Sequence, residues 1–419
     1  MVGHNSAKVF NFRVAPFYFG KAYNLEAMRP DVRAAVAHLD APFSILDLDA
    51  AIENAQSMTR RAQGTPIRLA SKSIRIRELI GRILDLPGYQ GILAFNLDEA
   101  MWLVESGTCD DVLVAYPSAN RESLHRLLCD PHLRDRITLM VDSVEHLNFI
   151  DAVLPPQERA AVRLCIDLDA ALEIGPLHIG ALRSPIRSAD HVRSFVRSIL
   201  ARQGFDIVGV MAYEGQIAGT TDTSPAIAAM KALSVKELAM RREVLVNIVH
   251  EELRATGRPA LEFVNGGGTG SIETTRAESV ITEIGAGSGI IGPGLFDHYK
   301  TFKPTPAEWF VVPVVRRPAP NTVTVAGGGR VASGPAGKDR LPVVDWPRDL
   351  KMATLEGPGE VQTPLTGAAA RNLQLGSHVW MRHAKAGEQC EWTDNVLVVS
   401  GGEIIDTWPT YRGEGKSFV

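Results

Sequence analysis

The amino-acid sequence predicts an α/β fold, a (β/α)8 TIM-like barrel followed by a C-terminal β domain. Between residues 41 and 300, short runs that are apolar at nearly every position alternate with amphipathic stretches. Such runs are typical of parallel strands that are buried on both faces. About eight of these units suit a closed barrel, and an open doubly wound sheet is the alternative. After Lys300 prolines cluster and strand-like runs follow without helices between them, which indicates a separate β domain.

The expected elements follow in chain order. The apolar runs of the first part are FSILDLD, IRLAS, GILAF, DVLVAYP, ITLMVDS, AVRLCIDLD, FDIVGVMAY, LEFVNGGG and VITEIGAG. Pro225 and Gly257 are plausible start and stop signals for one long helix. The second part contains the strand-like runs WFVVPVV, TVTVAG and HVWMRH, and NVLVVSGGEIIDTW predicts a hairpin that turns at Gly401–Gly402. We therefore expect an N-terminal extension over 1–40, which can pack with the β domain, a barrel over 41–300 and a β domain over 301–419.

Composition excludes several classes of protein. The 419 residues are 45% hydrophobic and 22% charged, which is too apolar for a disordered chain. The net charge is −4 without a basic stripe, so we expect no nucleic-acid partner. No run approaches the roughly 20 apolar residues of a membrane span, and the start lacks a signal-peptide pattern. The four cysteines form no CxxC pair, so a cytoplasmic protein without a disulfide framework is expected.

The segment IRLASKSIR contains the first candidate catalytic residue, Lys72. If IRLASK forms a strand, Lys72 lies at its C-terminal end, where barrel enzymes place catalytic groups. Arg68, Arg75 and Arg77 are close in sequence. Nearby cations disfavour the ammonium form and free an amine as a nucleophile. A solvated surface lysine is the alternative.

Two glycine-rich segments follow the last two predicted barrel strands. Gly267, Gly268 and Thr269 lie in FVNGGGTGSIE, and Gly287 and Ser288 lie in IGAGSGIIGPG. Consecutive glycines let the backbone approach an anion closely, and loops at this place in a barrel commonly bind phosphate. Neither segment is a Walker loop or a dinucleotide fingerprint. Tight turns without a ligand are the alternative.

A third candidate segment is MRHAKAGEQCEW in the predicted β domain. His383, Lys385, Glu388 and Cys390 fall within eight residues. Imidazole, carboxylate and thiolate groups all bind metals, but the spacing matches no standard zinc pattern, and the lysine would repel a cation. A structural or surface segment is the alternative.

Taken together, these motifs resemble the fold type III pyridoxal-phosphate enzymes, the alanine-racemase-like barrels. Within that group the chain is most similar to the D-threonine aldolase and D-serine dehydratase branch. The landmarks appear in the family's order over nearly the whole chain, and they read APFSILDLDAAIENA, RLASKS, LDEAMWLVESGTCDDVLVAYP, MAYEGQ, NGGGTG, EIGAGSG and IDTWPTYRGEG.

The resemblance implies pyridoxal 5′-phosphate as cofactor and assigns roles to residues of this chain. Lys72 would be the Schiff-base lysine, Tyr213 would face the cofactor, and Arg183 is the best match to the arginine of the sixth strand. The two glycine-rich turns, with Gly267, Gly268, Thr269, Gly287 and Ser288, would hold the phosphate.

The β-domain segment departs from the branch. Enzymes of the branch carry a His-x-Asp or His-x-Cys metal pair. Here His383 matches the first ligand, Lys385 occupies the second position, and Cys390 or Glu388 would reach the ion only if the chain loops back. A manganese or zinc ion at His383 and Cys390 is therefore less expected here than in the branch. His383 could act alone as a base, and Lys385 could bind the substrate carboxylate or help proton transfer.

The expected function is that of a lyase. The resemblance implies aldol cleavage of D-3-hydroxy amino acids to glycine and an aldehyde. The alternatives are dehydration or deamination of the same substrates, racemisation of an amino acid, a cofactor-carrying homeostasis protein and a phosphate-binding barrel without pyridoxal phosphate. The β domain argues against the homeostasis protein, because such proteins resemble only the barrel. The fold type also implies a homodimer, in which His383 reaches the barrel of the other subunit.

Overall fold

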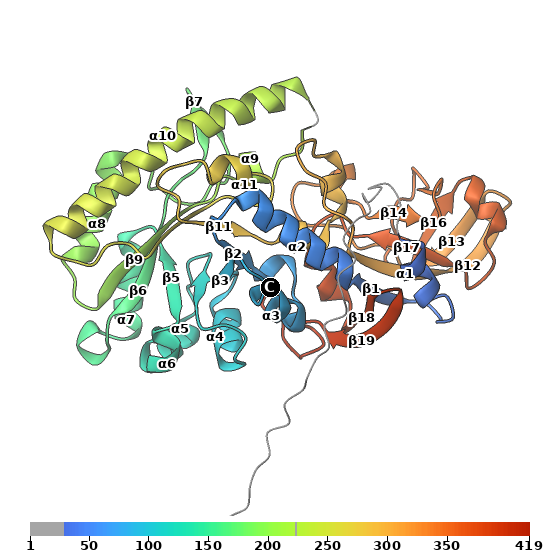
Figure 1. Ribbon diagram of the computed structural model, residues 1–419, viewed down its shortest axis with the longest axis horizontal. Coiled ribbons are helices and arrows are strands. Elements are labelled where there is room, and N and C mark those ends of the chain that lie inside the picture. Colours follow the sequence, from blue (N-terminus) through green and yellow to red (C-terminus); the bar gives the residue numbers. More distant parts are fainter. Residues whose placement is uncertain (1–28, 223) are drawn as a thin grey trace, which may run out of the picture.

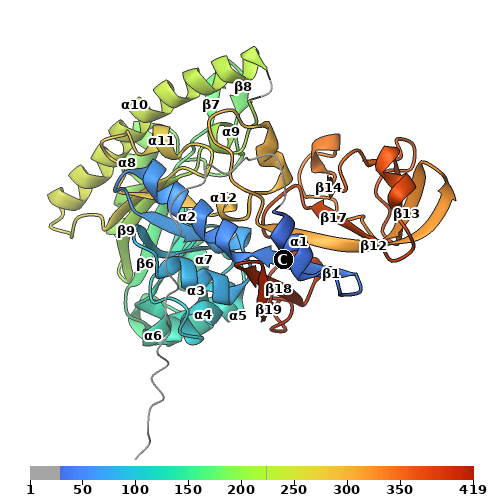
Figure 2. The ribbon, with the colours of Figure 1, turned by 45° about the vertical axis from the view of Figure 1, so that its right-hand side comes forward.

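The computed structural model describes residues 29–222 and 224–419. Figures 1 and 2 show two bodies side by side, a barrel with surrounding helices and a β domain. Among the described residues, no helix is both long and apolar enough to cross a membrane. Residues 1–28 of the expected N-terminal extension lie outside the described part of the chain.

The first body is a closed eight-stranded parallel barrel, as the sequence predicts. Each strand pairs in parallel with its neighbours, and β11 closes the barrel against β2 through Ile284 opposite Ile67. The strands, in barrel order, are β2 (Ile67–Ala70), β3 (Tyr89–Ala94), β4 (Val112–Val114), β5 (Ile137–Val141), β6 (Val162–Asp167), β9 (Phe205–Ala212), β10 (Phe263–Gly266) and β11 (Glu283–Ala286).

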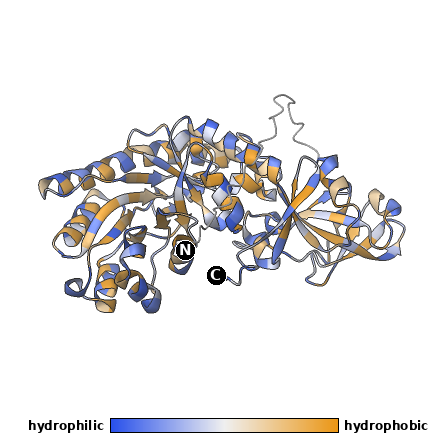
Figure 3. Ribbon diagram, turned by 60° about the horizontal axis from the view of Figure 1, so that its bottom comes forward, coloured by the Kyte–Doolittle hydropathy of each residue, from blue (hydrophilic) through white to orange (hydrophobic). Residues whose placement is uncertain are grey.

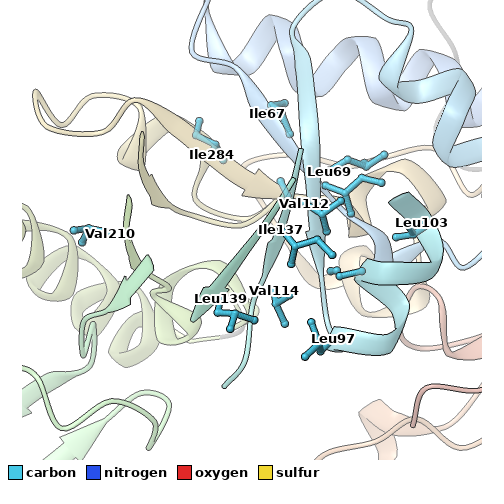
Figure 4. Packing of buried hydrophobic residues seen from close by; sticks show 14 of the residues in the cluster. Ile67, Leu69, Leu97, Leu103, Val112, Val114, Ile137, Leu139, Val210 and Ile284 are labelled. Carbon is cyan, nitrogen blue, oxygen red and sulfur yellow. The ribbon is translucent and has the colours of Figure 1, made fainter. Parts of the chain in front are cut away.

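Helices cover the outside of this barrel, and their apolar faces form the main core against the strands. They are α2 (Leu48–Ala62), α3 (Arg77–Leu84), α4 (Leu97–Glu105), α5 (Arg121–Cys129), α6 (Pro131–Arg134), α7 (Val144–Val153), α8 (Ala189–Leu200) and α10 (Pro225–Ala255). Three short helices, α9 (Gly215–Ala218), α11 (Ile272–Thr275) and α12 (Ser288–Ile291), instead follow the carboxyl ends of β9, β10 and β11. Figure 4 shows how this layer packs, with Leu69, Val112 and Ile137 of the strands close to Leu97 and Leu103 of α4. Buried branched side chains on alternate strand positions thus fix the barrel.

The predicted long helix is confirmed as α10, which has 31 residues and runs along one side of the barrel (Figure 1). The Ser224 hydroxyl accepts a hydrogen bond from the Ile227 amide and caps its start, and Pro225 occupies the first turn. Gly257 follows the end with φ +67°, the left-handed conformation that glycine adopts most easily. A short antiparallel pair, β7 (Leu172–Ile174) and β8 (Leu177–Ile179), was not predicted.

The second body is built on a mixed nine-stranded sheet. Its strands are β1 (Phe43–Asp47), β12 (Glu308–Ala319), β13 (Thr322–Ala326), β14 (Val343–Trp346), β15 (Lys351–Met352), β16 (Gln362–Thr366), β17 (His378–Arg382), β18 (Asn395–Ser400) and β19 (Glu403–Pro409). The β18–β19 hairpin turns at Gly401–Gly402, as predicted. In Figure 3 both bodies show hydrophobic strands beside helices of mixed character, consistent with the apolar cores of each sheet.

The strand β1 differs from the sequence prediction. The run FSILDLD was expected to open the barrel, yet β1 pairs antiparallel with β12 and parallel with β18 (Figure 2). The helix α1 (Pro30–Ala35) packs beside it on the same sheet through Val32. Nine apolar runs were available for eight barrel strands, and a run buried in a central sheet position looks the same as a barrel strand.

Candidate active site

A cavity of about 470 Å³ opens at the carboxyl ends of the barrel strands. One wall is formed by the barrel and the other by the β domain of the same chain. The barrel wall contains Lys72, Tyr116, Arg183, Tyr213, Asn265, Gly267, Gly268, Thr269, Gly287 and Ser288. The β-domain wall contains Ser333, Ala384, Lys385, Ala386 and Glu388. The residues that the sequence singled out at Lys72, at the glycine turns and at Lys385 thus border one space.

Lys72 lies in a 3₁₀ turn, Ser71–Ser73, directly after β2. Its Nζ atom donates a hydrogen bond to Tyr116 Oη at 3.2 Å. Glu99 of α4 lies beneath the turn, and its carboxyl group is fully buried. It accepts hydrogen bonds from the Phe95 amide at 2.8 Å and from the Tyr411 hydroxyl at 2.9 Å. Burial raises the pKa of Glu99 to about 7. The position of the lysine at the end of a barrel strand is therefore supported from below by a buried polar cluster.

The three arginines near Lys72 in sequence do not form a free cationic cluster around it. Arg68 points into the barrel and donates to Glu283 at 2.7 Å. Arg75 and Arg77 likewise form ion pairs with glutamates near the C-terminal end of the chain. Each arginine charge is neutralised locally, so the expected effect of these cations on the lysine amine loses its basis.

Tyr116, Tyr213 and Arg183 form the next part of the barrel wall. The guanidinium carbon of Arg183 lies 5.2 Å from the ring centre of Tyr116 and 5.1 Å from that of Tyr213. Burial by itself raises the pKa of Tyr116, but the charges of Lys72 and Arg183 outweigh it and lower the pKa overall. Burial raises the pKa of Tyr213. The exposed Arg183 thus places a permanent positive charge between two aromatic rings, where an anionic group of a ligand could bind.

The first glycine turn is held in place by a buried ion pair. Glu214 accepts hydrogen bonds from the Gly267 amide at 3.0 Å and from the Ser271 hydroxyl at 3.0 Å. Arg242 of α10 donates to the same carboxylate at 2.8 Å, and both side chains are almost fully buried. Gly267 has φ +84°, and a Cβ atom at Gly268 would lie only 2.7 Å from the side chain of Ala218. Glycine is therefore required at both positions for the backbone to take this path.

The second glycine turn joins the first through Thr269. The Thr269 hydroxyl oxygen accepts hydrogen bonds from the Gly289 amide and from the Ser288 hydroxyl, each at 3.1 Å. A Cβ atom at Gly287 would lie 2.6 Å from the carbonyl oxygen of Ala70. The two turns thus form one cradle of backbone and hydroxyl groups, beside the strand that carries Lys72. Such a cradle has the donor types that a phosphate group needs.

The β-domain wall comes from the chain that follows β17. Lys385 donates a hydrogen bond to the Ser333 hydroxyl at 2.9 Å, and its Nζ atom lies 3.8 Å from Glu388. Glu388 accepts from both the Ser333 amide, at 2.9 Å, and the Ser333 hydroxyl, at 2.5 Å. Gly387 has φ +83°, and a Cβ atom there would overlap the carbonyl oxygen of Lys72. Close contact at this glycine brings the two walls together.

His383 and Cys390, the predicted metal pair, have different surroundings and do not line the cavity. His383 Nδ1 lies 2.8 Å from the carbonyl oxygen of Lys385, and its Nε2 atom is enclosed without a hydrogen-bond partner in the described part of the chain. Cys390 donates to the carbonyl oxygen of Ile74 at 3.2 Å and to Glu308 at 3.5 Å. Burial raises the pKa of the Cys390 thiol well above its usual range. The thiol is thus hydrogen-bonded away from the cavity, and His383, Glu388 and Cys390 do not bring their ligand atoms close enough to share one ion.

One other group has the residue types of a metal site. Within residues 29–222 and 224–419, a group of three or more suitable ligand atoms is formed only by Asp169, Glu173 and His178. Arg187 already pairs with Asp169 at 2.7 Å and with Glu173 at 2.9 Å. A divalent ion would have to displace this guanidinium, so the arrangement is that of an ion-pair network.

Several residues of the site escaped sequence reasoning. Glu99 and Tyr116 lie inside LDEAMWLVESGTCDDVLVAYP and Glu214 lies inside MAYEGQ, both of which the sequence singled out, but the hydrogen-bond partners of these residues are distant in sequence. Gly387 lies inside MRHAKAGEQCEW, which the sequence also singled out, whereas Ser333 had no such signal. Gly387 is one of 37 glycines, and only the close approach of Lys72 distinguishes it.

The residues present fit pyridoxal phosphate. A lysine amine faces the cavity, a cradle of glycine turns with two hydroxyl groups lies beside it, and the cavity volume is within the range of small-molecule sites. Lys72 would hold the aldehyde end of the cofactor, the two glycine turns would hold its phosphate, and Tyr213 and Arg183 would border its ring. These assignments of single residues stay predictions.

The chain is similar to known proteins over most of its length. The family described as alanine racemase, N-terminal domain, matches residues 46–292, more than half of the chain. The chain is 24% identical to the 3-hydroxy-D-aspartate aldolase of Paracoccus denitrificans, over 90% of this chain and 94% of the relative. It is 22% identical to the D-threonine aldolase of an Arthrobacter species, over 89% and 92% of the two chains.

Two solved structures have a similar fold. The D-threonine aldolase of Filomicrobium marinum has a TM-score of 0.71 at 21% identity, with 90% of this chain and 96% of that chain covered. The D-threo-3-hydroxyaspartate dehydratase of Delftia sp. HT23 has a TM-score of 0.68 at 21% identity, with 90% and 98% covered. The match to the family extends over the barrel strands that carry Lys72 and both glycine turns. The chain therefore belongs to the alanine racemase N-terminal domain family, which uses pyridoxal phosphate.

Proposed function

We propose that the protein is a pyridoxal-phosphate-dependent lyase that cleaves D-3-hydroxy amino acids to glycine and an aldehyde. The observation that carries the proposal is the single cavity in which Lys72, the phosphate-type cradle and polar groups of the β domain meet. The likeness to two aldolases over nearly the full length of each chain supports it. When bound, pyridoxal phosphate withdraws electrons from the bonds at the amino acid's Cα, and the protein decides which bond breaks.

The residues of this chain would divide the work between the two walls. The barrel wall binds and orients, because Lys72 fixes the position of the cofactor and Arg183 offers a permanent charge to a carboxylate. The β-domain wall faces the side chain of the substrate, where the hydroxyl oxygen lies. The tight contact between Gly387 and Lys72 excludes water between the walls at this point. Aldol cleavage needs a group that acts on the hydroxyl at C3, and this wall supplies the polar side chains for it.

Product analysis tests the proposal. The protein, loaded with pyridoxal phosphate, is incubated with D-threonine, D-serine and their L-enantiomers, and products are separated by chromatography. Glycine with an aldehyde from a D-substrate is the expected result. A 2-oxo acid with ammonia would instead establish a dehydratase, and inversion at Cα would establish a racemase. Lys72→Ala should lose all product, whereas Lys351→Ala, on an exposed strand of the β domain, serves as the control.

We also propose a homodimer, on the ground of the resemblance to fold type III enzymes. In this chain, the segment that contains Lys385 borders the barrel of its own subunit. Light scattering of the purified protein coupled to gel filtration should give twice the mass of one chain. A monomer that retains full activity would contradict this part of the proposal.

A further inference from the structure

The β-domain wall carries positive charge at the place where relatives of this fold were expected to bind a metal. Lys385 faces the cavity, and the side chain of Arg340 lies near it. Both side chains border Gly334: the position of a Cβ atom on this glycine is 3.6 Å from Lys385 Nζ and 3.2 Å from Arg340 Nε. The Arg340 Nε atom is buried and has no hydrogen-bond partner among the described residues. Two cations of the protein thus converge on one small region of the wall.

Each of these cations has a carboxylate partner, because Lys385 Nζ lies 3.8 Å from Glu388 and Arg340 pairs with Asp339 at 3.3 Å. Glu388 is the carboxylate of this wall, and both of its oxygens accept hydrogen bonds from Ser333. His383 lies behind the wall, and the Cys390 thiol donates its hydrogen bonds away from the cavity. A divalent ion here would have to compete with Lys385 and Arg340 for Glu388 and Asp339, and both Glu388 oxygens already accept hydrogen bonds from Ser333, so binding of the ion is disfavoured.

We propose that the ammonium group of Lys385 takes the place of a divalent ion and binds the oxygen on C3 of the substrate. This inference rests on the proposed function, because it names the group that acts on the substrate hydroxyl. An ammonium group is a compact cation with three donors, and it stabilises negative charge on an oxygen in the same way as a metal ion, though without coordination geometry. The hydrogen bond to Ser333 uses one donor and leaves two for the ligand.

The position of Lys385 favours contact with C3 of the substrate over contact with the cofactor. Lys72 and Tyr116 hydrogen-bond to each other on the barrel wall, so the cofactor end of the cavity already has its amine. Lys385 comes from the opposite wall, and the contact of Gly387 with Lys72 keeps the two walls close. A ligand held at Lys72 would therefore present its side chain toward Lys385. The side chain of Lys385 is 34% exposed, which leaves its amine accessible to such a ligand.

Three variants of the loaded enzyme test the role of the charge. Lys385→Met removes the cation at similar length and should lower kcat for aldol cleavage about 100-fold, the effect of losing one donor to a developing oxyanion. Lys385→Arg keeps the cation and should stay within about tenfold of the wild type. Lys351→Met removes an exposed lysine of β15 that does not line the cavity, so its kcat should equal that of the wild type. Equal losses in Lys385→Arg and Lys385→Met would show that the positive charge is not what matters at this position, and would overturn the proposal.

Metal content gives a second measurement that does not depend on activity. Mass spectrometry should find the same amount of manganese and zinc in the purified wild type and in His383→Ala, and a chelator should leave wild-type turnover unchanged. One equivalent of metal that is present in the wild type and lost in His383→Ala would overturn the proposal. If the wild type forms no aldehyde from any 3-hydroxy amino acid, the proposed aldolase function fails, whereas the metal comparison still decides whether lysine replaces an ion.

Discussion

The two walls of the cavity are held in different ways. On the barrel wall, the backbone itself forms the cradle, and the buried Glu214–Arg242 pair fixes it from below. On the β-domain wall, partly exposed side chains face the cavity, and Lys385 and Glu388 are held by hydrogen bonds to Ser333. The barrel wall is thus specified by glycine positions and buried charge, and the β-domain wall by the identity of a few side chains.

This difference separates what is general in the site from what is particular to it. A cradle made of backbone groups holds the same phosphate whatever the substrate is. Side chains on the opposite wall can change without disturbing that cradle. One such change, a lysine in place of a metal-ligating residue, would alter which group acts on C3 of the substrate. Variants in the barrel wall should therefore affect cofactor binding and stability, whereas variants in the β-domain wall should affect turnover.

The largest effect on stability is expected at Arg242. Arg242→Met leaves Glu214 and Glu278 buried without their partner, and an unpaired buried charge typically costs about 3–5 kcal/mol of unfolding free energy. Urea denaturation measures this loss, and cofactor affinity should fall with it because Glu214 holds the Gly267 amide.

The matched control for this variant is Arg258→Met. Arg258 pairs with Asp206 on the surface, and both side chains are about half exposed, so the variant should cost about 0–1 kcal/mol. If the two variants are equally stable, the buried pair does not support the barrel wall in the way described.

A smaller effect is expected at Gly268, and it should appear in the affinity for pyridoxal phosphate. Gly268→Val places a side chain against Ala218, and overpacking of this kind costs about 1–3 kcal/mol, or about 5- to 150-fold in affinity. Fluorescence titration of the cofactor-free protein measures the change. In Gly81→Val, where a Cβ atom meets nothing within 4 Å, the affinity should be unaltered. Equal cofactor affinities in the wild type and in Gly268→Val would show that the two glycine turns do not bind the phosphate of the cofactor.

The barrel wall could be predicted from the sequence to a greater extent than the β-domain wall. Apolar runs and glycine turns are local patterns, so the barrel strands and both turns were found from residues that are near each other in the chain. The run FSILDLD was misplaced because burial on both faces is common to a barrel strand and to a central strand of another sheet. Its actual partners, β12 and β18, lie more than 250 residues away, and no local signal names them.

The β-domain wall depends on which side chains point into the cavity, and the spacing of residues in the sequence does not reveal this. His383 and Lys385 are two residues apart, yet Lys385 lines the cavity and His383 is buried behind it. This separation arises because the chain turns after β17 and the imidazole is held by the backbone of Lys385. Likewise, the pairing of Arg68, Arg75 and Arg77 with distant carboxylates removed an electrostatic argument that sequence proximity had suggested.

The smallest expected effect is on the pH dependence of the unfolding free energy, and it arises at Glu99, where the barrel contacts the end of the β domain through Tyr411. Its pKa is raised by burial to about 7, above the value of 4.5 for a free glutamate. The stability that this group contributes is therefore fully present below about pH 4.5 and is lost as the pH rises toward 7, because the unfolded chain ionises first. Between pH 6 and pH 8 the loss is about 1 kcal/mol, given about 1.4 kcal/mol for each unit of pKa difference.

Glu99→Gln should remove this part of the pH dependence, since an amide does not titrate. The unfolding free energy, measured by urea denaturation at pH 6 and pH 8, should fall less in the variant than in the wild type. Glu53→Gln, at an exposed position on α2, should keep the wild-type dependence. The hydrogen bond from Tyr411 connects Glu99 to the end of the β domain, so a loosened junction should also make the C-terminal segment exchange its amide hydrogens faster. An unchanged pH dependence in Glu99→Gln would mean that the carboxyl group titrates normally and that the junction depends on the apolar contacts of Tyr411 and Trp102 alone.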